Sequence, residues 1–578
     1  MKTTLGIFTL STLLLLASCA QEPDNSEVKN KQTASQVKTA QDQNKKVSHQ
    51  VEVLTAPQAE VEAIQVSRSR LAQASQMKGV VAHLPPVPPL LNKPAFNNEK
   101  YAKVQKNGTT LVSEQAVSTF SIDVDTAAYS NIRRLLNDGK MPQGDTIRLE
   151  ELINYFSYDY PAPKNHPFSV YSEVGPSPYN ADKQLIHIGI QGKAVPKQSR
   201  PAANLVFLID VSGSMNTPNK LGLLKNALKM LTKQLTEHDS VAIVVYAGAA
   251  GTVLPATSGD NKPAILDALA QLSAGGSTNG GAGIEAAYRL AQKNYIKDGI
   301  NRVMLATDGD FNVGTVNNQA LQHLIEQQRQ SGIELSILGL GKGNYNDELM
   351  QQLAQNGNGN AYYIDNLNEA RKVLVDELSS TLFTIAKDVK IQMEFNPQLV
   401  SEYRLIGYET RALKREDFNN DKVDAGEIGA GHSVTAIYEI SLVDGTNKAI
   451  EPLRYQNEKV STNKHSDELA FLRLRYKTPN QDTSKLIEQT IKATAIKNNL
   501  ANTSDNFKFS AAVAGFGELL QGGKHLTTMD ESAIIALAQQ SKGDDLHGYR
   551  SEFISLVKLA QALKPLPPKA PNAPIKSN

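Results

Sequence analysis

The chain has 578 residues, a formal net charge of +1 and 21% charged residues. That length exceeds what one hydrophobic core holds, so two or three domains are expected. The near-neutral charge and the lack of a basic stripe argue against nucleic-acid binding, which depends on clustered positive charge. With one cysteine, Cys19, the chain cannot form an internal disulfide.

Residues 1–18 have the pattern of a bacterial export signal. After a positively charged start, residues 5–16 are mostly apolar, a run too short to span a bilayer. The run ends in Leu16-Ala17-Ser18-Cys19, which resembles the lipobox of bacterial lipoproteins. That resemblance implies cleavage before Cys19 and two or three acyl chains, which anchor a protein firmly in a membrane. Because Ala20 and Gln21 follow instead of Asp, resemblance to enterobacterial lipoproteins favours the outer membrane of the cell envelope.

Residues 19–118 are expected to form a disordered tether behind the lipidated cysteine. They are rich in Gln, Asn, Lys, Ser and Ala and include Pro85-Pro86-Val87-Pro88-Pro89. Such a stretch buries too little apolar area to offset its ordering entropy. It should be flexible at first and stiffer near the prolines. The alternative to a fully irregular tether is a short helix over about 58–76.

Ordered structure is expected to begin at Thr119, with 119–200 as an N-terminal flanking region. Apolar and polar residues alternate over 120–125, which indicates a strand. Helices are predicted over 127–137 and 147–156, and strands over 168–174 and 184–191. Asp123 and Asp125 are interpreted as solvent-facing strand residues that lead into a helix cap. The alternative for this pair is a second metal site.

Strands and helices alternate through the central segment, residues 201–385. The predicted strands are 204–210, 240–246, 252–255, 302–308, 334–340 and 361–364. The predicted helices are 220–235, 262–271, 281–297, 319–331, 347–355 and 369–385. This alternation predicts an α/β fold with a doubly wound, mostly parallel sheet and helices on both faces. Ligands of such sheets bind beyond the carboxyl ends of the strands.

Three loops at that edge of the predicted sheet offer hard oxygen atoms. Asp210-Val211-Ser212-Gly213-Ser214 and Ala306-Thr307-Asp308-Gly309-Asp310 each follow an apolar run, and Gly276-Ser277-Thr278-Asn279 lies between them. The carboxylates of Asp210 and Asp308 and the hydroxyls of Ser212, Ser214 and Thr278 suit a small hard cation such as Mg²⁺. The same loops lack the His and Cys that zinc prefers. The sequence therefore predicts a metal-dependent binding site.

These motifs resemble the von Willebrand factor A (vWA) domain and its metal-ion-dependent adhesion site (MIDAS). The family's five positions are filled by Asp210, Ser212, Ser214, Thr278 and Asp308. The resemblance implies one Mg²⁺ or Mn²⁺, bound directly by the two serines and through water by the two aspartates. Thr278 would bind it directly once a protein partner supplies an exposed Asp or Glu.

Two residues beyond that pattern, Asp310 and Asn312, extend the Asp308 loop. They either tune the positions of waters around the metal or are ordinary solvated loop residues.

The C-terminal third of the chain is divided into three regions. Residues 386–480 are predicted to be β-rich, with strands over 389–395, 399–406, 433–442 and 468–476. Together with the strands before Gly192 they should form a β-sandwich, into which the vWA domain is inserted with its two ends close together. Residues 481–564 are predicted to be helical, over 485–498, 509–520, 530–540 and 549–563. The proline-rich residues 565–578 are expected to be disordered.

An acidic cluster lies within the β-rich region. Asp417, Asp421, Asp424 and Glu427 are interpreted as an acidic turn, because their spacing does not match a calcium-binding loop.

Three flanking stretches extend the resemblance to a family of bacterial vWA lipoproteins over about 119–563. They are 121–130, 148–156 and 415–429. The resemblance implies a membrane-anchored protein that binds a protein partner through the metal and is not an enzyme. The alternatives are a structural envelope protein whose metal only stabilises the fold, and a metal-dependent hydrolase. Hydrolysis is disfavoured because His238 and Asp239 belong to no recognisable catalytic pattern.

Overall fold

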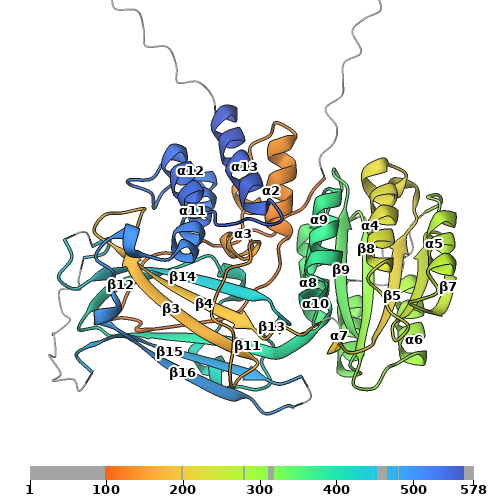
Figure 1. Ribbon diagram of the computed structural model, residues 1–578, viewed down its shortest axis with the longest axis horizontal. Helices are drawn as coiled ribbons and strands as arrows, with labels where there is room; N and C mark the ends of the chain where they lie inside the picture. Colours follow the sequence, from red (N-terminus) through yellow and green to blue (C-terminus); the bar gives the residue numbers. More distant parts are fainter. Residues whose placement is uncertain are drawn as a thin grey trace, which may run out of the picture. The chain divides into compact units, whose positions relative to one another are not determined.

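The computed structural model describes residues 98–196, 199–277, 280–309, 318–446, 448–451, 465–479 and 481–564. The predicted signal peptide, Cys19, the first part of the predicted tether and the predicted tail lie outside these ranges. No helix in the described ranges is both long enough and apolar enough to cross a membrane. These ranges contain an α/β domain, a β-sandwich and a layer of helices (Figure 1).

The α/β domain is built on a six-stranded sheet of order β10-β9-β8-β5-β6-β7. The strands are β5 (Ala203–Asp210), β6 (Ser240–Tyr246), β7 (Ala250–Ser258), β8 (Ile300–Thr307), β9 (Glu334–Leu340) and β10 (Ala361–Ile364). Every neighbouring pair from β10 to β6 is parallel, and the edge strand β7 is antiparallel. The predicted mostly parallel sheet is confirmed.

Helices cover both faces of this sheet (Figure 1). They are α4 (Leu223–Thr232), α5 (Lys262–Gln271), α6 (Gly280–Lys293), α7 (Asn318–Gln330), α8 (Asp347–Asn356), α9 (Leu367–Arg371) and α10 (Leu378–Leu382). α4, α5, α9 and α10 share one hydrophobic core with the sheet, and α6, α7 and α8 share another. The predicted helix over 369–385 is irregular and ends early. α9, a π-helical segment at Lys372–Asp376 and α10 follow one another to Leu382, and from Thr384 onward the chain pairs with a strand of the sandwich.

Two antiparallel sheets form the β-sandwich, one of order β1-β12-β14-β4-β3 and one of order β13-β11-β15-β16, with β2 paired to β11. The strands are β1 (Thr110–Leu111), β2 (Val117–Ser121), β3 (Phe168–Pro176), β4 (Gln184–Gly192), β11 (Thr384–Phe395), β12 (Val400–Ile406), β13 (Gly426–Gly429), β14 (Ser433–Leu442), β15 (Glu468–Lys477) and β16 (Lys485–Lys492). Apolar side chains of both sheets share one core. The strands before and after the α/β domain therefore build one sandwich, as predicted.

The two ends of the α/β domain lie beside one turn of the sandwich, at 429–432. The Gly192 N–H donates to the His432 carbonyl at 2.7 Å where the chain leaves β4. The Ala430 N–H donates to the Phe383 carbonyl at 2.8 Å where the chain returns to β11. This is the arrangement expected for a domain inserted between two strands.

A layer of helices packs on the sandwich sheet that contains β4 and β14 (Figure 1). The helices are α2 (Ala127–Asn137), α3 (Leu149–Asn154), α11 (Asp505–Leu520), α12 (Glu531–Gln540) and α13 (Tyr549–Leu563). The prediction of a helix over 485–498 is wrong, because Lys485–Lys492 forms β16 and pairs with β15. Leu486, Ile487 and Ile491 have helical spacing, but pairing with a neighbouring strand overrides such a local preference.

Two further predictions fail for segments that are ordered by distant partners. Ordered structure begins before Thr119, since β1 pairs with β12, so the predicted tether over 19–118 is too long. Asp123 and Asp125 do not face solvent. Each is 3% exposed and lies 2.9 Å from a nitrogen of Arg411. Local sequence could not reveal that pair, because Arg411 follows Asp123 by 288 residues.

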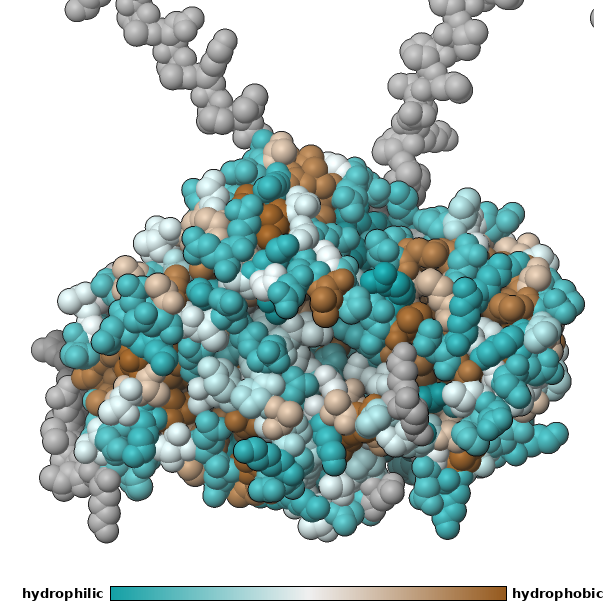
Figure 2. All heavy atoms as spheres, viewed as in Figure 1, coloured by the Kyte–Doolittle hydropathy of each residue, from teal (hydrophilic) through white to brown (hydrophobic). Residues whose placement is uncertain are grey.

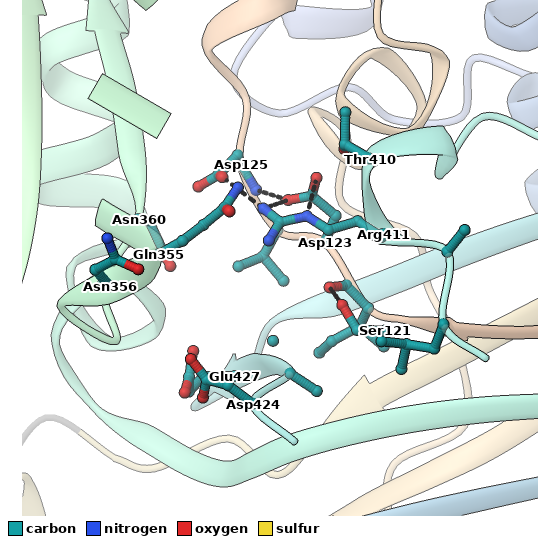
Figure 3. A pocket seen from close by; sticks show the side chains of 17 residues that line it. Ser121, Asp123, Asp125, Gln355, Asn356, Asn360, Thr410, Arg411, Asp424 and Glu427 are labelled. Carbon is teal, nitrogen blue, oxygen red and sulfur yellow. Dashed lines mark hydrogen bonds and ion pairs between the residues drawn. The ribbon is translucent and has the colours of Figure 1, made fainter. Parts of the chain in front are cut away.

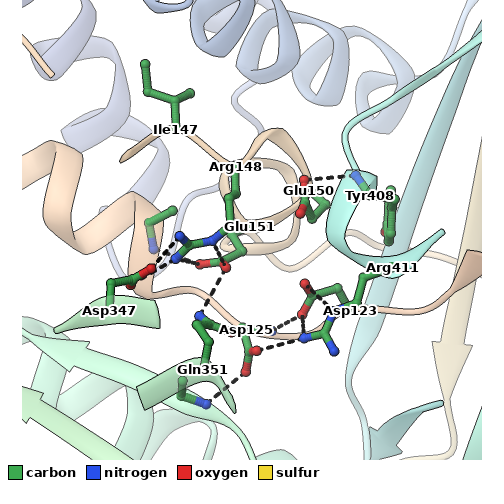
Figure 4. A network of polar contacts seen from close by, with 12 residues as sticks. Asp123, Asp125, Ile147, Arg148, Glu150, Glu151, Asp347, Gln351, Tyr408 and Arg411 are labelled. Carbon is green, nitrogen blue, oxygen red and sulfur yellow. Dashed lines mark hydrogen bonds and ion pairs between the residues drawn. The ribbon is translucent and has the colours of Figure 1, made fainter. Parts of the chain in front are cut away.

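Buried ion pairs join the helical layer to the α/β domain (Figure 4). Arg148, at the start of α3, pairs with Glu151 in its own helix and with Asp347, the first residue of α8, at 2.6 Å. Gln351 of α8 donates to Glu151 at 3.2 Å. Arg148, Glu151 and Asp347 are all buried. Because a buried charge is tolerated only with partners, these contacts fix α8 against the flanking region.

Replacing Arg148 with Met should strongly destabilise the protein, because Glu151 and Asp347 would become uncompensated buried carboxylates. We expect the free energy of unfolding to fall by about 3–5 kcal/mol, measured by urea denaturation with circular dichroism. Arg289→Met is the control, since Arg289 is 70% exposed in its pair with Glu285 and should contribute less than about 1 kcal/mol. Equal losses in the two variants would contradict the assignment of Arg148 as a buried connection.

Candidate metal centre

Asp210 is the last residue of β5 and is fully buried at the carboxyl edge of the sheet. Its Oδ1 accepts a hydrogen bond from the Ser212 N–H at 2.8 Å. Its Oδ2 accepts from the hydroxyls of Tyr246 and Thr307 at 3.3 and 3.4 Å. The Ser212 and Ser214 hydroxyl oxygens lie 3.0 Å apart. The D-x-S-x-S spacing therefore brings a carboxylate and two hydroxyls together on one loop.

Asp308 follows β8, the strand next to β5, and is also fully buried. Its Oδ2 lies 2.7 Å from Nζ of Lys220, which is 7% exposed. The same ammonium donates to the Ser214 carbonyl at 3.1 Å and to Oδ1 of Asn344 at 3.5 Å. Lys220 is therefore a cation built into the candidate site. Sequence reasoning missed it, because a lysine in a predicted helix carries no motif.

The surroundings of Asp210 raise the pKa of its carboxyl group, whereas those of Asp308 lower the pKa of its carboxyl group. Burial raises the pKa of Asp210, and repulsion from the Asp308 carboxylate raises it further. Hydrogen bonds from Ser212 lower this pKa but do not outweigh the other two effects. Burial alone would also raise the pKa of Asp308, but hydrogen bonds from Lys220 and Ser214 and the charge of Lys220 outweigh it and lower that pKa. Asp308 thus already has a cationic partner, whereas Asp210 is held by neutral donors.

The loop that leads to Thr278 lies against the Asp210 loop. The Gly275 N–H donates to the Val211 carbonyl at 2.7 Å, and the Gly213 N–H donates to the Gly276 carbonyl at 3.1 Å. Gly276 has φ +88°, a conformation that favours glycine. Thr278 itself lies outside the described residues, as do Asp310 and Asn312. The contacts up to Ser277 nonetheless bring this loop to the predicted site.

The donor set fits a hard divalent cation. Within the part of the chain that the structure describes, no group of three or more His, Cys, Asp or Glu side chains could hold a metal. A metal at this edge would therefore depend on the hydroxyls of Ser212 and Ser214 as well as on Asp210 and Asp308, a hard-oxygen set of the kind Mg²⁺ prefers. Oxygen atoms of two of these loops already surround one positive charge, because the Lys220 ammonium donates to both the Asp308 carboxylate and the Ser214 carbonyl.

A hollow of about 240 Å³ lies between α8 and the flanking region (Figure 3). Asp123, Asp125 and Arg411 line it, and so do Asp424 and Glu427. Its α/β wall includes Gly359 and Asn360, directly before β10 begins, so this hollow is at the opposite edge of the sheet from Asp210. It is separate from the candidate metal centre.

The acidic cluster beside this hollow does not converge on one point. The Asp421 carboxylate accepts from the Ser484 N–H at 3.3 Å, whereas Asp424 pairs with Arg329 at 2.5 Å. Burial raises the pKa of Glu427 well above its usual range, and repulsion from Asp424 adds to this. Because Asp421 and Asp424 bind different partners, the cluster resembles an acidic turn more than a calcium loop.

Comparison with known proteins places the chain among vWA proteins. The von Willebrand factor type A domain family matches residues 204–376, a von Willebrand factor family matches 95–187, and the C-terminal family of the uncharacterized protein YfbK matches 380–563. The uncharacterized protein YfbK of Escherichia coli (strain K12) is 45% identical over 473 residues, which cover 80% of this chain and 81% of that protein.

Two solved structures match parts of the chain with low TM-scores. A von Willebrand factor type A protein from Catenulispora acidiphila has a TM-score of 0.39 and 15% identity, over 68% of this chain and 91% of its own. Proximal thread matrix protein 1 from the mussel byssus, solved with a zinc-occupied MIDAS motif, has a TM-score of 0.26 and 22% identity. That match covers 31% of this chain and 45% of its own.

Gly309→Ala should disturb the candidate site more than a glycine replacement nearby. Gly309 has φ +94°, and a Cβ there would lie 2.6 Å from backbone atoms of Tyr345 and Asn346. Gly343 has φ +96° but nothing within 4 Å of its Cβ position, so Gly343→Ala is a matched control. The control should cost about 1–2 kcal/mol of strain, and Gly309→Ala clearly more. Equal shifts in the thermal midpoint would contradict this close contact between the two loops.

Proposed function

This chain belongs to the YfbK-like family of bacterial proteins that carry a vWA domain, and we propose that it captures a protein partner through a divalent metal. vWA domains generally mediate protein–protein interactions and commonly bind a divalent metal at a MIDAS. One observation carries the proposal for this chain: Asp210, Ser212, Ser214 and Asp308 gather at the carboxyl edge of the sheet.

The proposed metal is Mg²⁺ or Mn²⁺, held by the hydroxyls of Ser212 and Ser214 and, through water, by Asp210 and Asp308. Thr278 would complete the site when a partner binds. Such a cation supplies positive charge that few direct anionic ligands neutralise, so it favours an Asp or Glu of the partner. The residues of this chain then have two tasks, which are to position the hydroxyls and to keep both carboxylates ionised.

The arrangement supports binding better than hydrolysis. A serine hydroxyl and an imidazole meet in the sandwich and helical layer, where Oγ of Ser510 is 3.0 Å from His187, and His187 is 2.8 Å from the Tyr160 hydroxyl. All three residues are buried, and burial lowers the pKa of His187 to about 3. This neutral imidazole is closed to substrate and links α11 to β4.

Hydrophilic side chains cover most of the face in Figure 2, and apolar side chains form small separate patches there. A partner that binds this face through a broad apolar interface would need a larger contiguous patch. Capture of one acidic side chain by a metal requires no such patch.

The proposal predicts that partner capture needs both the metal and Thr278. Immobilised protein is exposed to envelope extract in Mg²⁺ and, separately, in EDTA. Wild type should retain a partner in Mg²⁺ only, and Thr278→Ala should weaken retention at least about tenfold, the effect of losing roughly 1.4 kcal/mol. Ser277→Ala is the matched control, because it removes a neighbouring exposed hydroxyl. Capture that survives EDTA and Thr278→Ala would place the binding surface elsewhere.

We also propose that Cys19 anchors the protein in the outer membrane through its lipid. The support is the lipobox-like run Leu16-Ala17-Ser18-Cys19 and the polar stretch after it. Cells fed a fatty-acid probe should label wild type and not Cys19→Ser, which should stay uncleaved or mislocalised. Label on the variant would show that the lipid is attached at another residue.

A further inference from the structure

Residues Asn98–Lys100 run beside the loop that follows β9. The Asn98 N–H donates to the Gly343 carbonyl at 2.8 Å, and the Lys100 N–H donates to the Tyr345 carbonyl at 3.0 Å. The Asp347 N–H donates in turn to the Lys100 carbonyl at 3.0 Å. Lys100 and Asn346 thus form a parallel bridge. We call Asn98–Lys100 the strap and Gly341–Asn346 the β9–α8 loop.

The side chain of Glu99 strengthens this attachment. It is 3% exposed; its Oε1 accepts from the Gly343 N–H at 2.9 Å, and its Oε2 lies 2.9 Å from Arg134 of α2. The Tyr101 hydroxyl also donates to Oε2 at 2.9 Å. Burial alone would raise the pKa of Glu99, but the hydrogen bonds from Gly343 and Arg134 outweigh it and lower that pKa. The strap is therefore held by its backbone and by a buried, ionised carboxylate.

The opposite side of the β9–α8 loop forms a wall of the candidate metal centre. Gly341 has φ +74°, and a Cβ there would lie 2.2 Å from Cε of Lys220, so the backbone packs directly on the lysine side chain. Asn344 accepts from Nζ of Lys220 at 3.5 Å. Gly309, next to Asp308, packs against the backbone of Asn346. One short loop thus contacts both the strap and the groups at the site.

Lys220 has a direct electrostatic effect on any metal bound there. Its ammonium lies 2.7 Å from Asp308 and 3.1 Å from the Ser214 carbonyl, two residues of the predicted metal-binding set. Like charges a few ångströms apart repel each other. A divalent cation at the site would therefore compete with Lys220 for Asp308, and anything that holds Lys220 in place weakens metal binding.

We infer that the strap regulates the metal affinity of the site by holding Lys220 on Asp308 through the β9–α8 loop. Release of the strap loosens the loop, Lys220 withdraws from Asp308, and the cation binds more tightly. This inference rests on the metal site proposed above. If the chain is anchored at Cys19, the strap lies between the anchor and the α/β domain in the sequence.

The test is Mn²⁺ binding to the full-length protein in detergent, measured by calorimetry. Lys100→Pro removes the N–H that bonds to Tyr345, and it should tighten Mn²⁺ binding about three- to tenfold, the range of a typical coupling between two sites. Lys103→Pro is the matched control, because Lys103 is exposed and lies outside the strap. It should bind Mn²⁺ as wild type does.

A double-mutant cycle tests whether the coupling passes through Lys220. Lys220→Gln should tighten Mn²⁺ binding by itself, and adding Lys100→Pro should then have no further effect. If the two substitutions changed the free energy of Mn²⁺ binding additively, the coupling would not pass through Lys220. Mn²⁺ binding that is equal in wild type and Lys100→Pro would overturn the inference and leave the metal site standing. Lack of Mn²⁺ binding in every variant would overturn both.

Hydrogen exchange on the wild type gives a second test that needs no substitution. Coupling between two sites is reciprocal, so a metal that binds better when the strap is released must also favour that release. Saturating Mn²⁺ should speed exchange of the Lys100 and Asp347 amides, which donate across the strap and the loop. Unchanged or slower exchange of these amides would overturn the inference.

Discussion

Asp210 ends β5 and Asp308 directly follows the neighbouring parallel strand β8, and neither is exposed to solvent. A carboxylate in such a place is tolerated only when donors or a cation compensate for its lost hydration. Asp210 is compensated by the Ser212 N–H and two hydroxyls, and Asp308 by the ammonium of Lys220. The hydrogen bonds and the ion pair in the Asp210 and Asp308 loops meet this requirement. A divalent cation would meet it more fully, because it adds positive charge that both carboxylates can share.

The same requirement explains how the flanking regions hold the α/β domain. Arg148 and Arg411 are each placed between buried carboxylates, and Arg148 also pairs with Asp347 of α8. A hydrophobic interface could slide with little loss, whereas a buried pair loses its compensation when either partner moves. The α/β domain is therefore fixed to the flanks at α8, whose preceding loop also borders the candidate metal centre. The strap acts on that same loop.

Local sequence patterns were sufficient for the parallel sheet and for the position of Asp210, Ser212, Ser214 and Asp308 at its carboxyl edge. Metal binding by these residues stays a prediction. Apolar strands that alternate with helices give the sheet, and the D-x-S-x-S spacing together with Asp308 marks its carboxyl edge. Lys220, Arg411 and β16 were missed because their roles depend on residues far away in the chain. Asp123 and Asp125 have the local pattern of an exposed strand, and only Arg411 explains their burial. The strap is ordered in the same way, by contacts with the loop after β9.

The location of a bound metal tests the account most directly. A crystal of the protein grown or soaked with Mn²⁺ and measured at the manganese absorption edge would give that location. The account predicts one strong anomalous peak, within about 2.0–2.6 Å of the Ser212 and Ser214 hydroxyl oxygens, as expected for a hard cation with oxygen ligands, and with the Asp210 and Asp308 carboxylates facing it. A peak at another site, or ordered loops without a peak at saturating Mn²⁺, would contradict the claim that these residues form a metal-dependent binding site.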